Sequence, residues 1–234
     1  MYAAHFAASL GCKVAEPRVP LGALLTAGMA PDLAFALLMR SGIERIEAPI
    51  GAPFAEWQIV APYSHGAFTA GGAALLFGFG MWLALRQVRA GPWIASLAGA
   101  LLLHLVCDWC VDPSGLRLFA NSQATSGLRL WQSSPALAML LEVSVVGIGT
   151  GLFLRTTASM SWTVRLAALG LLGMLTWEST LGQRGTVLPM RSPELAMPYF
   201  RQIVLDLLMV GVIATLSTTT VPKVRAAPAS AADT

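Results

Sequence analysis

The sequence predicts an all-α fold, a polytopic transmembrane helical bundle with about six spans and an N-terminal half-helix. Of its 234 residues, 56% are hydrophobic and 12% are charged, and the mean hydropathy is +0.66. A soluble globular domain carries about 25% charged residues. The apolar runs approach the roughly 20 residues that a helix needs to cross a bilayer, and they are much longer than the alternating segments of a membrane barrel.

The chain is expected to form one transmembrane domain, residues 1–221, followed by a disordered tail, residues 222–234. The apolar stretch 2–11 is too short to span a membrane, so it predicts a half-helix that ends near Lys13. The full spans then follow with short and long connections alternating. They are expected at residues 21–39, 62–85, 92–111, 135–154, 164–181 and 199–216.

The charged residues give a weak indication of orientation. Lys and Arg are divided almost evenly between the two sides, but short basic loops such as the one with Arg86 and Arg89 count most under the positive-inside rule. We therefore expect a multi-pass protein with its short loops in the cytoplasm. The net charge of +3 is scattered along the chain, which argues against a nucleic-acid partner, since that would need a clustered basic patch.

Residues 104–115 carry the clearest functional signal. His104 and Asp108 lie in a predicted span one helical turn apart, so they share a helix face, and Asp112 extends that face by another turn. Ionisable groups inside a membrane are costly, and they usually have both partners and a function. The spacing H-x-x-x-D suits a metal site on a helix. Cys107 and Cys110 form a C-x-x-C motif that fits small apolar packing residues.

Depth within the membrane brings other polar groups to the same level. At about 1.5 Å of rise per residue, Asp32 is expected at nearly the height of His104. Both lie in the half of the membrane that adjoins the long loops. The other groups expected in or pointing to this half are His5, His65, Glu142, Glu178 and Asp206.

These groups predict a site for a divalent metal ion. Imidazole and carboxylate ligands together favour zinc and also suit iron or manganese. A catalytic zinc usually keeps three protein ligands and an open position for water. The remaining acids would orient the ligands or act as general base, and we expect Glu142 and Asp112 in that catalytic role. The metal ligands are expected among His5, Asp32, His65, His104 and Asp108.

Other interpretations of the same residues stay open. A single histidine in a helix is more often a hydrogen-bonded core residue than a metal ligand. Glu178 and Asp206 fit packing or ion-pair partners, for example of Arg184 or Arg201. The aromatic residues near the long loops fit an interfacial belt.

Several short motifs follow one another through the first two-thirds of the chain. They are His5-Phe-Ala, Pro31-Asp32, Gly42-Ile-Glu44, Pro62-Tyr-Ser-His65, His104-x-x-x-Asp108, Gly127-Leu-Arg-Leu-Trp131 and Glu142. In this order they resemble a family of bacterial inner-membrane proteins described as membrane-bound metal-dependent hydrolases, the YdjM-like group and its relatives. The resemblance implies that the metal is bound by His5, Asp32, His65, His104 and Asp108. Relatives often have a histidine where this chain has Asp112, which makes the expected site richer in oxygen.

The resulting hypothesis is a hydrolase of the bacterial inner (plasma) membrane that acts, among membrane lipids, on a lipid-like or interfacial ester or phosphoester. The main alternative is a non-enzymatic subunit of a larger membrane complex, in which protein partners surround the bundle and the polar residues join helices. A haem protein with two histidine ligands, for instance His65 and His104, is another. A small transporter is a further one, although the internal repeats common in transporters are not visible in this sequence.

Overall fold

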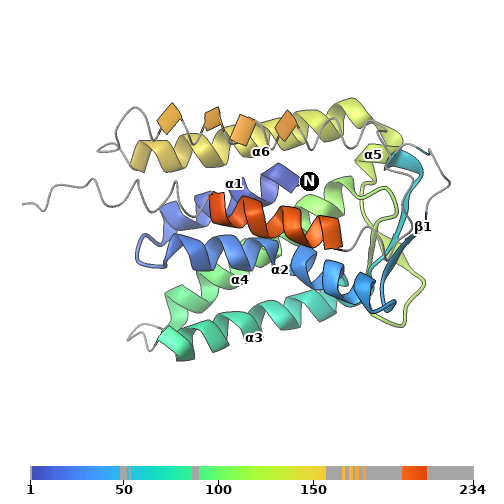
Figure 1. The fold of residues 1–234 in the computed structure, drawn as a ribbon, viewed down its shortest axis with the longest axis horizontal. Coiled ribbons are helices and arrows are strands. Elements are labelled where there is room, and N and C mark those ends of the chain that lie inside the picture. Colours follow the sequence, from blue (N-terminus) through green and yellow to red (C-terminus); the bar gives the residue numbers. More distant parts are fainter. Residues whose placement is uncertain are drawn as a thin grey trace, which may run out of the picture.

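The computed structural model describes residues 2–47, 52, 54–85, 90–156, 165–166, 169–170, 172–173, 176–177 and 197–209. Most of these residues are helical, as predicted. Residues 197–209 form a helical stretch that Figure 1 draws in orange-red. The named helices are α1 (Tyr2–Ala15), α2 (Leu21–Arg40), α3 (Ala67–Leu85), α4 (Ala90–Val111), α5 (Leu130–Ser133) and α6 (Pro135–Thr156).

Three of the described helices are long and apolar enough to cross a membrane, within the bounds Leu21–Arg40, Gly91–Val111 and Pro135–Arg155. They lie where the sequence predicts spans, and they are compatible with a membrane protein. The number of six spans remains a prediction. Most of the predicted span 164–181, the end of the span 199–216 and the predicted tail 222–234 lie outside the described residues.

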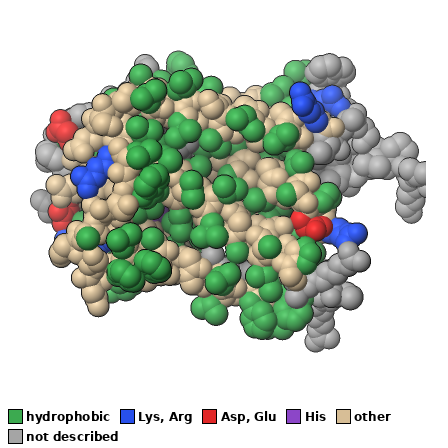
Figure 2. All heavy atoms as spheres, turned by 180° about the vertical axis from the view of Figure 1, so that it is seen from behind, with side chains coloured by type: hydrophobic (Ala, Val, Ile, Leu, Met, Phe, Trp, Pro, Cys, Tyr) green, Lys and Arg blue, Asp and Glu red, His purple; other side chains and the backbone are tan. Residues whose placement is uncertain are grey.

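The outward faces of the long helices are apolar. Leu76 on α3 is 73% exposed, and Leu140 and Ile148 on α6 are 62% and 64% exposed. On the face drawn in Figure 2, hydrophobic side chains spread over the middle of the molecule, whereas the coloured Lys, Arg, Asp and Glu side chains lie toward its two ends. A helix that exposes apolar side chains as well as burying them is typical of a helix surrounded by lipid.

The two long connections that follow α2 and α4 each contain a short antiparallel hairpin that the sequence did not predict. Strand β1 (Arg45–Glu47) pairs with β2 (Gln58–Val60), and the 3-10 turn η1 (Phe54–Glu56) lies between them. Strand β3 (Leu116–Arg117) pairs with β4 (Thr125–Ser126). Strands of two or three residues are too short for an alternating pattern to be recognised. Figure 1 shows β1 and α5 at the same end of the bundle.

Helix α1 lies between the longer helices and packs against α2, α4 and α6. Its side chains Phe6 and Ala7 are fully buried. On α6, Gly149 permits a close approach, because a Cβ added there would lie 2.3 Å from the carbonyl oxygen of Ala7. A short helix is therefore held inside the bundle by its neighbours, and it brings His5 with it.

Replacing Gly149 by alanine is expected to lower the free energy of unfolding by about 1–3 kcal/mol, because the added methyl group collides with the backbone of α1. Gly147 on the same helix has no atom within 4 Å of an added Cβ, so Gly147→Ala serves as the control. Thermal unfolding of both variants in detergent checks this. Equal melting temperatures for the two variants would contradict the close packing of α1 on α6.

Candidate metal centre

Five buried side chains from four parts of the chain meet at one point. Helix α1 contributes His5, α2 contributes Asp32, and α4 contributes His104 and Asp108. The fifth, His65, lies in a tight turn just before α3, where Gly66 leaves no room for a side chain because a Cβ would lie 2.3 Å from the carbonyl oxygen of Pro62. The exposed fraction is 8% or less for each of the five. The structure thus brings together all five residues that the sequence predicted as metal ligands.

Asp108 is at the centre of the group. Its Oδ2 lies 3.0 Å from Nε2 of His104 and 3.4 Å from Nε2 of His65. Its Oδ1 lies 3.3 Å from Nε2 of His5. Nε2 of His65 is also 3.3 Å from Nε2 of His104 and 3.7 Å from Oδ1 of Asp32. The shared face of His104 and Asp108 predicted from the H-x-x-x-D spacing is therefore observed.

These distances match the spacing of ligands around a small metal ion. Zinc lies about 2.0–2.1 Å from a histidine nitrogen, so neighbouring ligand atoms in a tetrahedral site are about 3.3 Å apart. Two sets of three residues each offer ligand atoms within 4.8 Å of one another, namely His5, Asp32 and His104, and His65, His104 and Asp108. Each of these sets could therefore hold a metal ion, and the two sets share His104.

The hydrogen bonding of His104 fixes which of its nitrogens faces the site. Nδ1 lies 2.7 Å from the carbonyl oxygen of Gly28. A carbonyl only accepts hydrogen bonds, so Nδ1 carries the proton and donates. When the ring is neutral, the Nε2 atom directs its lone pair at Asp108 and His65. A backbone carbonyl bonded to the second nitrogen is the usual way in which a metal-binding histidine is oriented.

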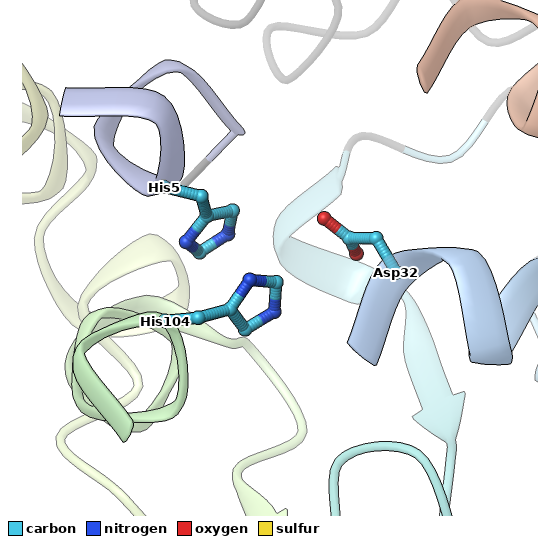
Figure 3. A group of neighbouring side chains, drawn as sticks. All are labelled: His5, Asp32 and His104. Atoms are coloured by element: carbon cyan, nitrogen blue, oxygen red, sulfur yellow. The ribbon is translucent and has the colours of Figure 1, made fainter. Parts of the chain in front are cut away.

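Two polar atoms at the site have no partner within the described part of the chain. They are Nδ1 of His5 and Oδ2 of Asp32, and both are buried. Figure 3 shows the rings of His5 and His104 lying face to face, with Asp32 pointing toward them from α2. The two ring centroids are 3.6 Å apart and the ring planes differ by 18°. Buried polar groups without hydrogen bonds are costly, so an unpaired carboxylate oxygen beside imidazoles favours a bound cation.

Tyr199, from the helical stretch 197–209, is a member of the site that the sequence did not indicate. Its hydroxyl donates a hydrogen bond of 2.7 Å to Oδ1 of Asp32. Phe35, one turn after Asp32 on α2, packs edge-on against both Tyr199 and His65. Tyr199 stands at the start of a predicted span on the long-loop side of the membrane. This expected depth is the one signal in the sequence that places Tyr199 near the depth of the site.

Asp112, predicted as a catalytic group, lies just beyond the end of α4 and outside both described sets that can share an ion. Its Oδ1 accepts hydrogen bonds from the backbone N–H and the hydroxyl of Ser114, at 2.7 and 2.6 Å. Burial raises the pKa of the Asp112 carboxyl to about 6, and the bonds from Ser114 oppose that rise. Ser114 also accepts from the N–H of Ile59 on β2 at 3.2 Å, which joins the two long connections.

Glu142, the other predicted catalytic group, is fully buried on α6. Its Oε1 accepts a hydrogen bond of 3.1 Å from the backbone N–H of Ala3, in the first turn of α1. The N–H groups of a helix's first turn lack partners within the helix, and a carboxylate there is favourable. This position of Glu142 supports a role in holding α1, and with it His5. The role of Glu142 as a general base remains a prediction.

Of the two remaining predicted acids, the structure describes Asp206, which lies outside both sets of residues that could share an ion. Asp206 is buried, and its Oδ2 accepts hydrogen bonds from Tyr2, at 2.5 Å, and from the side chain of Gln202. It is thus a packing partner of α1, and no ion pair with Arg201 is found among the described residues. Glu178 and Arg184 lie outside the described residues.

The geometry does not suit a haem bound between His65 and His104. Two axial histidines bind haem iron from opposite faces of the macrocycle. Oδ2 of Asp108 lies 3.4 and 3.0 Å from the Nε2 atoms of His65 and His104, so a carboxylate oxygen occupies the space beside these atoms that the macrocycle would need.

No family model matches this chain, and neither a curated protein nor a solved structure similar to it was found. The case for a function therefore rests on the residues of the site and on their geometry.

Proposed function

We propose that this protein is a membrane-embedded, metal-dependent hydrolase that acts on a lipid-like or interfacial ester or phosphoester. In this proposal the chain crosses the bacterial inner membrane about six times, with its short loops in the cytoplasm, and α1 is a half-helix inside the bundle. The buried histidine and aspartate groups of the candidate metal centre and the apolar outward faces of α3, α4 and α6 support it.

The observation that carries the proposal is the meeting of hydrogen-bond acceptors, which are electron-pair donors to a metal, at Asp108. Oδ2 of Asp108 and Nε2 of His104 are 3.0 Å apart, and the proton of His104 is committed to Gly28 on the other side of the ring. An ionised carboxylate is an acceptor only. Lone pairs placed against each other in a buried site require a proton or a metal cation between them. With five donor groups at ligand spacing, a divalent metal ion meets that requirement better than a single proton.

The ligands proposed for the ion are His5, Asp32, His65, His104 and Asp108, with zinc the favoured metal. A bound zinc would lower the pKa of a water ligand toward neutrality and polarise the bond to be hydrolysed. The chain supplies orientation: Gly28 holds His104, and Tyr199 holds Asp32. The site lies among apolar helices, which suits a substrate with an apolar part.

Elemental analysis of detergent-purified protein tests the metal site. We expect about one zinc, iron or manganese per chain in the wild type and none in the double variant His104→Ala with Asp108→Ala. The control is Ser133→Ala, an exposed position on α5 away from the five ligands. Full metal content in the double variant would contradict the site.

A second measurement tests the hydrolase. Wild-type protein is offered fluorogenic ester and phosphoester lipids in mixed micelles, before and after chelation and metal return. Hydrolysis that depends on the metal and is absent from the double variant supports the proposal. A metal-loaded protein that hydrolyses neither class contradicts it and favours the membrane-subunit alternative.

A further inference from the structure

A fully buried carboxylate, Glu44, lies behind His65 on the side away from the metal ligands. Its Oε1 accepts hydrogen bonds from the backbone N–H groups of Tyr63 and Ser64, at 2.8 and 2.9 Å. Its Oε2 accepts from the hydroxyl of Ser64 at 2.6 Å. Glu44 is 0% exposed, and these three bonds compensate a buried charge that would otherwise be costly.

The hydroxyl of Ser64 has a second contact, with Nδ1 of His65 at 2.8 Å. A hydroxyl carries a single proton, and an ionised carboxylate cannot donate one. Because Ser64 gives its proton to Glu44, its oxygen can only accept from His65. Nδ1 of His65 therefore carries a proton, and in the neutral ring Nε2 keeps its lone pair. That lone pair faces Asp108 and His104.

We propose that Glu44 and Ser64 are positioning residues that hold His65, through a carboxylate–hydroxyl–imidazole chain, in the tautomer that can bind a metal through Nε2. This inference rests on the proposed metal-binding function. It gives His65 an arrangement equivalent to that of His104, whose Nδ1 is held by the carbonyl of Gly28. Partners of this kind orient metal-binding histidines and raise their basicity.

The chain of bonds makes Glu44→Gln a sharp test. The glutamine oxygen still accepts from the two backbone N–H groups, so its NH₂ group faces Ser64 and donates. Ser64 then accepts from Gln and turns its own proton toward Nδ1 of His65. The ring is driven into the Nε2–H tautomer, whose Nε2 has no lone pair for a metal. This substitution preserves the shape of the side chain but exchanges donor and acceptor at each hydrogen bond from residue 44 through Ser64 to His65.

The first experiment reads the tautomer without any metal. The protein has three histidines, so a ¹⁵N-histidine-labelled sample gives few signals, and the one lost in His65→Ala is assigned to His65. Metal-free protein is measured by NMR at about pH 10, where histidine is neutral. We expect His65 to be protonated on Nδ1 in the wild type and on Nε2 in Glu44→Gln. A wild-type ring protonated on Nε2 overturns the inference.

The second experiment measures zinc affinity by competition with a chromophoric chelator. We expect Glu44→Gln and Ser64→Ala each to weaken zinc binding by about 10- to 100-fold. In Ser64→Ala the backbone N–H bonds to Glu44 remain, so the turn is retained while the link to His65 is lost. The control is Tyr63→Phe, in the same turn, whose side chain is half exposed. It is expected to bind zinc like the wild type.

The outcomes separate this inference from the proposed function. If the wild type binds zinc through His104 and Asp108 but Glu44→Gln and Ser64→Ala bind it equally well, the positioning role is wrong and the metal site stands. If the wild type binds no metal, the proposed function is wrong, and the tautomer measurement still decides whether Glu44 and Ser64 fix His65. Should Glu44→Gln fail to fold, Ser64→Ala carries the affinity test.

Discussion

Removal of the metal ion proposed for this site is expected to lower the melting temperature of the purified protein by about 8–16 °C. Zinc held at 1,000 times its dissociation constant stabilises the folded state by about 4 kcal/mol. For a chain of this length each kcal/mol corresponds to about 2–4 °C. The physical reason is that two carboxylates and three imidazoles meet in a buried site, with Asp108 within 3.4 Å of all three rings.

Differential scanning fluorimetry in detergent, with chelator and then with zinc returned, measures this shift. The double variant His104→Ala with Asp108→Ala is the matched control, because it lacks the two central ligands. Its melting temperature is expected to be the same with and without zinc. A wild type that contains zinc yet melts at the same temperature without it would show that the ion lies elsewhere than among these buried ligands.

Placing an arginine at Ile148 is expected to destabilise the protein in lipid by about 3 kcal/mol. Ile148 is 64% exposed near the middle of α6, and the translocon scale gives about 2.5–3.5 kcal/mol for a basic residue at the centre of a span. In water the same exposed position would accept arginine with a change within about 0.5 kcal/mol. The substitution therefore distinguishes a lipid-facing surface from a wet one.

The matched control is Leu137→Arg, on the same helix and 53% exposed, but close to the helix end where an arginine can reach the interface. Reversible unfolding in mixed micelles and the yield of folded protein in the membrane fraction give the two values. Equal, small effects at both positions would contradict a membrane-spanning α6.

The sequence was sufficient for the parts of this protein that depend on local pattern. The predicted spans 21–39, 92–111 and 135–154 correspond closely to α2, α4 and α6, because long apolar runs specify helices of membrane length whatever lies beside them. The face shared by His104 and Asp108 followed from helical spacing alone. The two hairpins were missed, since strands of two or three residues leave no pattern.

The rise per residue along each predicted helix placed the polar groups at similar depths in the membrane. Groups at the same depth can still lie far apart laterally, so depth alone does not define a site. Only the packing of helices decides which groups at that depth face one another. It brings His5 to Asp108, because α6 and α2 admit α1 between them, and it places Glu142 at the start of α1 and Asp112 against Ser114. Tyr199 reaches Asp32 from a segment 167 residues away.

By itself the sequence predicted the helical class, the positions of the long apolar helices and the residue types that could hold a metal ion, because each depends on neighbours within a few turns. The tertiary structure alone decided which nitrogen of each imidazole faces the site. For His104 that depends on Gly28, and for His65 on Ser64 and Glu44, none of which shares a helix with its ring. The position of a proton depends on the acceptor at the far side of the ring. For His104 that acceptor is Gly28, which is distant in sequence, and for His65 it is the adjacent Ser64, which the distant Glu44 orients.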